Sequence, residues 1–185
     1  CYATNLLGTY AAQPGKKHVQ GLGHTMKYLK SSTDKGLLLG GKDKIEHIMY
    51  SDASYNKRYD SKAQYAYTEF LSKSSGVVHY KAKTSTTVCN SVTEAELRAA
   101  AEACKEIKWM RNFLRELGIN LTKPSQLWVD NSAIIDIVSS YGNYENCKVF
   151  NRDINFVRDC IHKRLIEVNH VPSEENPADD LSKVL

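Results

Sequence analysis

Apolar and polar residues alternate along three segments between residues 45 and 83, as they do in half-buried β-strands. The first segment, 45–54, contains Asp52 near its end. The second and third, 64–73 and 76–83, are rich in Tyr, Val and Phe and are joined by the turn sequence Ser-Ser-Gly. This pattern predicts three consecutive antiparallel strands.

The apolar spacing changes to every third or fourth residue over 92–117, which predicts a long helix that ends at Gly118. Similar patterns predict the remaining elements, which are strands over 126–130 and 165–171, helices over 131–140 and 147–162, and a terminal helix opened by Asn176 and Pro177. This order indicates an α/β fold with a five-stranded mixed sheet. Its three antiparallel strands and two parallel strands would be flanked by helices.

The N-terminal part of the chain differs from the rest. Residues 1–39 predict two short helices around a break at 11–18, and 40–44 (GGKDK) is a turn or linker signal. Residues 1–44 hold seven Lys against two acidic residues, a net charge of +5, while the whole chain carries +4. We therefore expect an N-terminal helical segment, 1–44, before a domain, 45–185, and the charge is compatible with a polyanionic partner.

Composition excludes several classes of protein. The 42% hydrophobic content is typical of a globular domain, no apolar run is long enough to cross a membrane, and no signal-peptide pattern is present. The 5 cysteines include no Cys-x-x-Cys pair. We expect buried free thiols in a reducing intracellular compartment, rather than disulfides or a zinc knuckle.

Candidate chemistry lies near the ends of the predicted elements. Four carboxylates are expected to converge there, which are Asp52 in YSDAS, Glu96 in TEAELRAAAEA, Asp130 in LWVDNS and Asp179 in NPADDLSK. Closely spaced carboxylates repel one another unless a cation neutralises them. Because no cage of His and Cys accompanies them, the set favours hard divalent cations, foremost Mg²⁺, and predicts a two-metal site that cleaves phosphodiesters.

Neighbouring acids leave some assignments open. Glu94 and Glu96 are two residues apart on the predicted helix, so only one of them can face the sheet. Glu94 fits a capping box and Glu96 projects closer to the apolar stripe, which favours Glu96 as the ligand. Asp130 also fits a helix N-cap, and the helical pattern does not decide between Asp179 and Asp180.

The motifs YSDAS, SVTEAELRAA, WVDNSAI and NPADDLSKVL together resemble the ribonuclease H domain of copia-type LTR retrotransposon Pol polyproteins. Residues 2–39 resemble the C-terminal end of the reverse transcriptase that precedes this domain. The resemblance implies a ribonuclease H-like fold over 45–185, with 1–44 as the reverse transcriptase or connection segment and its linker. It also selects Glu96, and it selects Asp179 over Asp180.

The resemblance implies an endoribonuclease that degrades the RNA strand of RNA/DNA hybrids during retrotransposon reverse transcription. Its implied mechanism is two-metal-ion hydrolysis, with two Mg²⁺ ions, or Mn²⁺, bound by Asp52, Glu96, Asp130 and Asp179. The implied partners are the RNA/DNA hybrid and the reverse transcriptase domain of the same polyprotein, with no membrane. The implied location is the cytoplasm, in a virus-like particle, or the nucleus.

Polar residues near the carboxylates are candidates for contacts with 2′-hydroxyls or with the phosphate backbone. They are Ser54, Asn90, Asn131, Ser132, Lys57 and Arg58, of which Lys57 and Arg58 also fit a solvated loop. Many ribonucleases H carry a mobile histidine between the last strand and the last helix, but 172–176 (PSEEN) has none. His170, within the predicted strand, is therefore either an auxiliary residue or a structural histidine.

Two other functions fit the sequence less well. A degenerate or host-adopted copy that binds nucleic acid or a protein without cutting has no need for four crowded charges. A DNA-strand transferase or integrase of similar fold normally uses three acids, and the chain has no zinc-binding His-His-Cys-Cys segment. The sequence therefore favours a ribonuclease.

Overall fold

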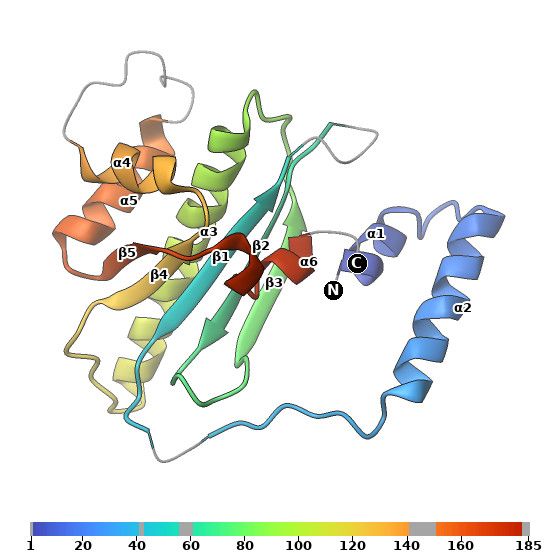
Figure 1. Cartoon of the computed structure of the whole chain (residues 1–185), viewed down its shortest axis with the longest axis horizontal. Coiled ribbons are helices and arrows are strands. Elements are labelled where there is room, and N and C mark those ends of the chain that lie inside the picture. Colours follow the sequence, from blue (N-terminus) through green and yellow to red (C-terminus); the bar gives the residue numbers. More distant parts are fainter. Residues whose placement is uncertain (1, 41–42, 56–60, 141–150, 183–185) are drawn as a thin grey trace.

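The computed structural model describes residues 2–40, 43–55, 61–140 and 151–182 (Figure 1). The elements in chain order are α1 (Tyr2–Thr9), α2 (Lys16–Ser31), β1 (Ile48–Ser54), β2 (Gln64–Phe70), β3 (His79–Thr84), α3 (Val92–Glu116), β4 (Ser125–Val129), α4 (Ser132–Ser139), α5 (Asn151–His162), β5 (Ile166–His170), a 3₁₀ turn (Ser173–Glu175) and α6 (Asp179–Ser182). Within these ranges, no helix has the length and apolar character needed to cross a lipid bilayer.

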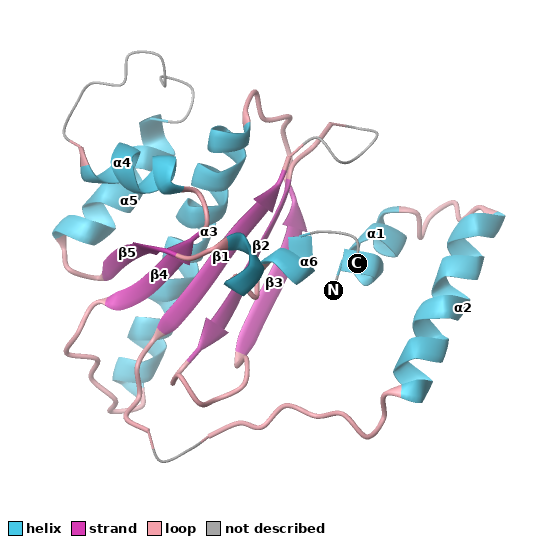
Figure 2. Cartoon of the chain, in the orientation of Figure 1, coloured by secondary structure: helices cyan, strands magenta, loops and turns pink. Residues whose placement is uncertain are grey.

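The sheet has the strand order β3-β2-β1-β4-β5 (Figure 2). β2 is antiparallel to β1 and to β3, whereas β4 is parallel to β1 and to β5. A short connection joins β2 to β3, while the parallel pairs need crossovers, which contain α3 in one case and α4 and α5 in the other. The predicted five-stranded mixed sheet with flanking helices is confirmed.

Helices cover the two faces of the sheet unequally. In Figure 1, α3 lies behind the strands and α6 lies in front of them. Met49 of β1 packs in the main apolar core with Leu97 of α3, and Ala53 packs with Ala95 of the same helix. Because side chains alternate along a strand, these two residues point to α3 and their neighbours point to the opposite face, where α6 contacts β1 and β2.

The start of β3 differs from the prediction. The strand begins at His79 rather than at residue 76. Gly76 donates its backbone N–H to the carbonyl of Leu38, at 2.7 Å, so this part of the hairpin pairs with the segment that precedes the sheet. A contact with such a distant residue leaves no signal in the local alternation.

The start of the terminal helix also differs, because α6 begins at Asp179 instead of at Pro177. The Asn176 side chain accepts a hydrogen bond from the backbone N–H of Ala178, at 3.0 Å. Asn176 and Pro177 therefore form a turn before the helix. The helix predicted over 147–162 is described from Asn151 onward, and 147–150 lie outside the described residues.

The two predicted N-terminal helices are present, but only α1 is attached to the sheet. Asn5 of α1 donates from Nδ2 to the carbonyl of Ala82 on β3, at 2.8 Å. α2 has no buried residue, and it stands away from the sheet in Figure 1. Its apolar residues are more than half exposed, and they are Val19, Leu22, Met26 and Leu29.

The described cysteines are buried free thiols, as predicted, and they are Cys89, Cys104 and Cys160. A hydrogen bond with Cys160, together with burial, raises the pKa of the Cys104 thiol well above its usual value. The same hydrogen bond lowers the pKa of Cys160. The pair joins α3 to α5 inside the apolar core.

A polar chain, buried except at His79, links the residue before β1 to β2, β3 and β4. His47 Nε2 lies 2.6 Å from Glu69 Oε1, and His47 Nδ1 lies 2.8 Å from Ser125 Oγ. The second oxygen of Glu69 lies 3.1 Å from His79 Nδ1. An ionised carboxylate can only accept hydrogen bonds, so both facing ring nitrogens are donors when Glu69 is charged. Glu69 itself is fully buried.

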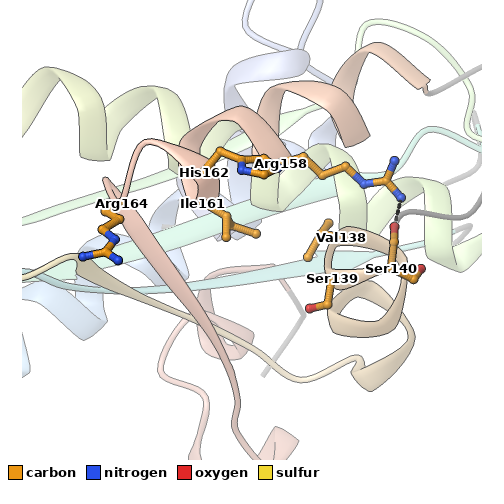
Figure 3. Close-up of a pocket in the computed structure, with 7 residues that line it drawn as sticks. All are labelled: Val138, Ser139, Ser140, Arg158, Ile161, His162 and Arg164. Carbon is orange, nitrogen blue, oxygen red and sulfur yellow. Dashed lines mark hydrogen bonds between the residues drawn. The ribbon is translucent and has the colours of Figure 1, made fainter.

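Arg158 of α5 joins this helix to the C-terminal end of α4 (Figure 3). Its guanidinium donates to the carbonyl of Ile137, at 2.8 Å, and to the carbonyl of Ser140. Ile137 lies in the last turn of α4 and Ser140 is its C-cap. Backbone carbonyls at this end of a helix have no hydrogen-bond partner within the helix. We expect Arg158→Ala to lower the free energy of unfolding by about 1–3 kcal/mol, measured by urea denaturation. Arg152→Ala is the control.

Arg152 is on the same helix, but its side chain is largely exposed. Its removal should change the unfolding free energy by less than about 0.5 kcal/mol. Equal effects of the two substitutions would show that the contacts with the α4 carbonyls do not stabilise the fold.

Candidate active site

Asp52, Glu96 and Asp130 meet where the parallel strands β1 and β4 end. Ser51 pairs with Val129 across these strands, so Asp52 and Asp130 occupy the next position on each strand. Glu96 comes from the N-terminal part of α3, which packs on β1. One oxygen of each carboxylate lies within 4.8 Å of the other two. Three elements from distant parts of the sequence therefore form one acidic cluster.

The cluster is shielded from water on one side, because Asp52 is 1% exposed and Glu96 is 7% exposed. At 4.8 Å, two unit charges repel each other by about 3 kcal/mol if the effective dielectric constant is about 20. A divalent cation would offset this repulsion. Its donors would be carboxylate oxygens alone, the ligands that Mg²⁺ and Mn²⁺ prefer, so the residues fit the predicted cofactor.

Asp179, the fourth predicted ligand, is not part of the cluster of three within 4.8 Å. It is the first residue of α6, and its backbone N–H donates to the carbonyl of Asn176 at 3.0 Å. α6 contacts β1, the strand that carries Asp52. The structure thus places Asp179 on an element that contacts the cluster's own strand, and its role as a ligand stays a prediction.

Glu94 has a structural role, as its position in a capping motif predicted. Its backbone N–H donates to the N-cap hydroxyl of Ser91 at 3.1 Å, and its carboxylate accepts the backbone N–H of Asn90 at 2.7 Å. The same carboxylate forms an ion pair with Arg98, at 2.7 Å. These contacts hold Glu94 at the start of α3, so Glu96 is the acid that reaches the cluster.

The alternative role of Asp130 as an N-cap is not observed. Asn131 caps α4, and its Oδ1 accepts the backbone N–H of Ala133 at 3.1 Å. The Asp130 carboxylate instead accepts a hydrogen bond from Ser173 Oγ, at 2.9 Å. His170 lies beside it at the end of β5, and its Nε2 donates to the Asp130 carbonyl at 3.2 Å. His170 is exposed, and both its auxiliary role and its structural role stay predictions.

The predicted nucleic-acid contacts differ in exposure. Asn90 and Ser132 are exposed, and Asn131 is half-buried. Ser54 is 5% exposed at the end of β1, which leaves it little surface for a direct contact. Lys57 and Arg58 lie outside the described residues.

The sequence interpretation missed two hydroxyls that contact the cluster. Ser173 donates to Asp130, and Ser182 of α6 donates to Asp52 Oδ2. Ser182 follows Asp179 by three residues, so the two share one face of a helical turn. The three-residue spacing could have indicated that Asp179 and Ser182 lie on one face of the helix, but it does not predict that Ser182 contacts Asp52.

No family model matches the chain. It is 29% identical over 185 residues to the retrovirus-related Pol polyprotein from transposon TNT 1-94 of Nicotiana tabacum, covering 100% of this chain and 14% of that protein. It is 28% identical over 185 residues to the corresponding polyprotein from transposon RE1 of Arabidopsis thaliana, covering 100% of this chain and 12% of that protein. The chain therefore spans a small part of the length of these relatives.

Solved structures share the fold. LC11-RNase H1 in complex with an RNA/DNA hybrid superposes with a TM-score of 0.57 at 13% identity, over 74% of this chain and 93% of that one. The foamy viral protease-reverse transcriptase in complex with dsDNA superposes with a TM-score of 0.53 at 16% identity, over 75% of this chain and 92% of that one. At these identities the likeness shows the fold alone. The chain is thus similar over its whole length to retrovirus-related Pol polyproteins from plant transposons, and it has the ribonuclease H-like fold.

Proposed function

We propose that the chain is a ribonuclease H, an endonuclease that hydrolyses the RNA strand of RNA/DNA hybrids with bound Mg²⁺ or Mn²⁺. The observation that carries this proposal is the cluster of Asp52, Glu96 and Asp130 within 4.8 Å, at the edge of a ribonuclease H-like sheet. The choice of substrate is supported by the related fold of LC11-RNase H1, whose structure contains such a hybrid. The relatives among retrotransposon Pol polyproteins also support it.

The three carboxylates are the proposed metal ligands, with Asp179 as a fourth. When bound, two divalent cations supply Lewis-acid activation of a water and stabilise the departing 3′-oxygen. Asp52 and Glu96 provide fixed negative charge from buried positions, while Asp130 lies at the open side of the cluster. His170 lies at the cluster's rim, where its Nε2 donates to the Asp130 carbonyl, and in the neutral imidazole this leaves Nδ1 as an acceptor.

Recognition of RNA would use the exposed polar residues around the cluster. Asn90, Asn131 and Ser132 lie at the starts of the two helices that follow β3 and β4, and we assign them contacts with 2′-hydroxyls. Lys57 and Arg58 are assigned to the phosphate backbone. The proposed protein partner is the reverse transcriptase domain of the same polyprotein, and the proposed location is a cytoplasmic virus-like particle or the nucleus.

Metal-dependent cleavage tests the proposal. With an end-labelled RNA strand in an RNA/DNA hybrid, we expect cutting in Mg²⁺ or Mn²⁺ and none in EDTA, because EDTA removes the cations that would activate the water and stabilise the departing oxygen. Single-stranded RNA and a DNA duplex of the same sequence are the controls and should stay intact. Cutting that persists in EDTA, or that extends equally to single-stranded RNA, would contradict the proposal.

A further inference from the structure

The last described part of the chain contacts the acidic cluster through two hydroxyls. Ser173 donates to Asp130 Oδ2, and Ser182 donates to Asp52 Oδ2. Each serine thus serves a different carboxylate, and both lie within ten residues of each other after β5. Ser173 is exposed, so water can replace its hydroxyl, whereas Ser182 is 0% exposed.

The Ser182 hydroxyl has one proton and two acceptors within reach. Asp52 Oδ2 is one, and the carbonyl oxygen of Asp179, at 3.2 Å, is the other. An ionised carboxylate is the stronger acceptor, so the proton is assigned to Asp52. Because Asp52 is almost fully buried, no water can supply the same hydrogen bond if the hydroxyl is removed.

A second side chain fixes the position from which Ser182 acts. Asn176 is buried, and its Nδ2 donates to the carbonyl of Ser51, at 3.0 Å. Its Oδ1 accepts the N–H of Ala178, which starts the turn into α6. A helix of four residues has no stability of its own, so these contacts hold α6 on β1. The segment is therefore attached at two successive residues of β1, Ser51 and Asp52.

We propose that Ser182 is a positioning residue that sets the orientation of the Asp52 carboxylate for metal binding, an inference that rests on the proposed function. The hydrogen bond engages one carboxylate oxygen and so restricts rotation of the group. Hydrogen bonds of this kind to metal ligands typically account for about 10–100-fold in metal affinity or activity.

The test compares Ser182→Thr with Ser182→Val, which have the same shape and differ in the hydroxyl. Binding of Mn²⁺ alone is measured by calorimetry at a temperature where both variants are folded, and hybrid cleavage is measured separately. We expect Ser182→Thr to keep Mn²⁺ affinity within about 3-fold of the unchanged chain, and Ser182→Val to lose about 10–100-fold.

Ser72→Ala is the control for the loss of a buried hydroxyl. Ser72 Oγ accepts the N–H of Ser75 at 3.1 Å, in the connection after β2 at the opposite end of β1. The Ser72→Ala substitution should lower the melting temperature without changing Mn²⁺ affinity. If Ser182→Val binds Mn²⁺ as tightly as Ser182→Thr, the positioning role is wrong. If the unchanged chain binds Mn²⁺ but cuts no hybrid, the proposed function fails, while the comparison of affinities still decides the role of Ser182.

Discussion

Asp52→Asn is expected to reduce cleavage of an RNA/DNA hybrid by more than about 100-fold while the protein stays folded. Loss of an outer contact to a metal ligand already accounts for about 10–100-fold, and this change removes charge from a ligand itself. The fold should tolerate the change, because an amide is no larger than the carboxylate and can still accept the hydrogen bond from Ser182. Initial rates at saturating Mg²⁺ measure the effect.

Stability provides an independent check on the same variant. In EDTA, Asp52→Asn should melt at the same temperature as the unchanged chain or higher, because one of three mutually repelling charges has been removed. Asp136→Asn is the matched control, since Asp136 is an exposed acid on α4, and it should leave cleavage unchanged. Full activity of purified Asp52→Asn would contradict the assignment of the active site.

Glu69→Ala is expected to lower the free energy of unfolding by about 3–5 kcal/mol, the usual cost of removing one partner from a buried charged contact. Glu69 accepts from His47 and His79. Water cannot replace the hydrogen bond that the buried His47 would lose, whereas the His79 side chain is 39% exposed. The loss also leaves a cavity between β1, β2 and β3. Urea denaturation at neutral pH measures the change.

Glu46→Ala is the control for the loss of a carboxylate in the same region. Glu46 faces Lys123 at 3.8 Å, and both side chains are exposed, so the substitution should cost less than about 1 kcal/mol. Glu69→Gln keeps one acceptor oxygen and the shape of the side chain, so it should lower the free energy of unfolding less than Glu69→Ala does. If Glu69→Ala were as stable as Glu46→Ala, the polar chain would not contribute to stability.

Local sequence patterns were sufficient for the elements and for three of the acids. Alternation identified the strands, and the projection of Glu96 toward the apolar stripe separated it from Glu94. These predictions were possible because hydrophobic periodicity and helix capping depend on neighbours within four or five residues. The sequence predicted that Asp52 and Asp130 converge, whereas the parallel pairing of β1 with β4 that brings them together was found only in the structure.

Contacts between distant residues were not predictable in this way. The shift of β3 to His79 depends on Leu38, and the delayed start of α6 depends on a turn at Asn176. The partner of Ser182 lies 130 residues away, and no periodicity spans such a distance. Asp179 was selected over Asp180 by family resemblance alone, and the cluster of three carboxylates within 4.8 Å contains neither.

The attachment of α6 also sets the order in which a growing chain acquires its chemistry. Asn176 follows Ser51, its partner on β1, by 125 residues, and Ser182 follows Asp52 by 130 residues. A ribosome would therefore release the whole sheet and three of the carboxylates before α6 leaves its exit tunnel. The nascent protein could fold early and still lack a correctly oriented Asp52. By the same logic, removal of α6 would take away both the Ser182 hydrogen bond to Asp52 and the carboxylate of Asp179.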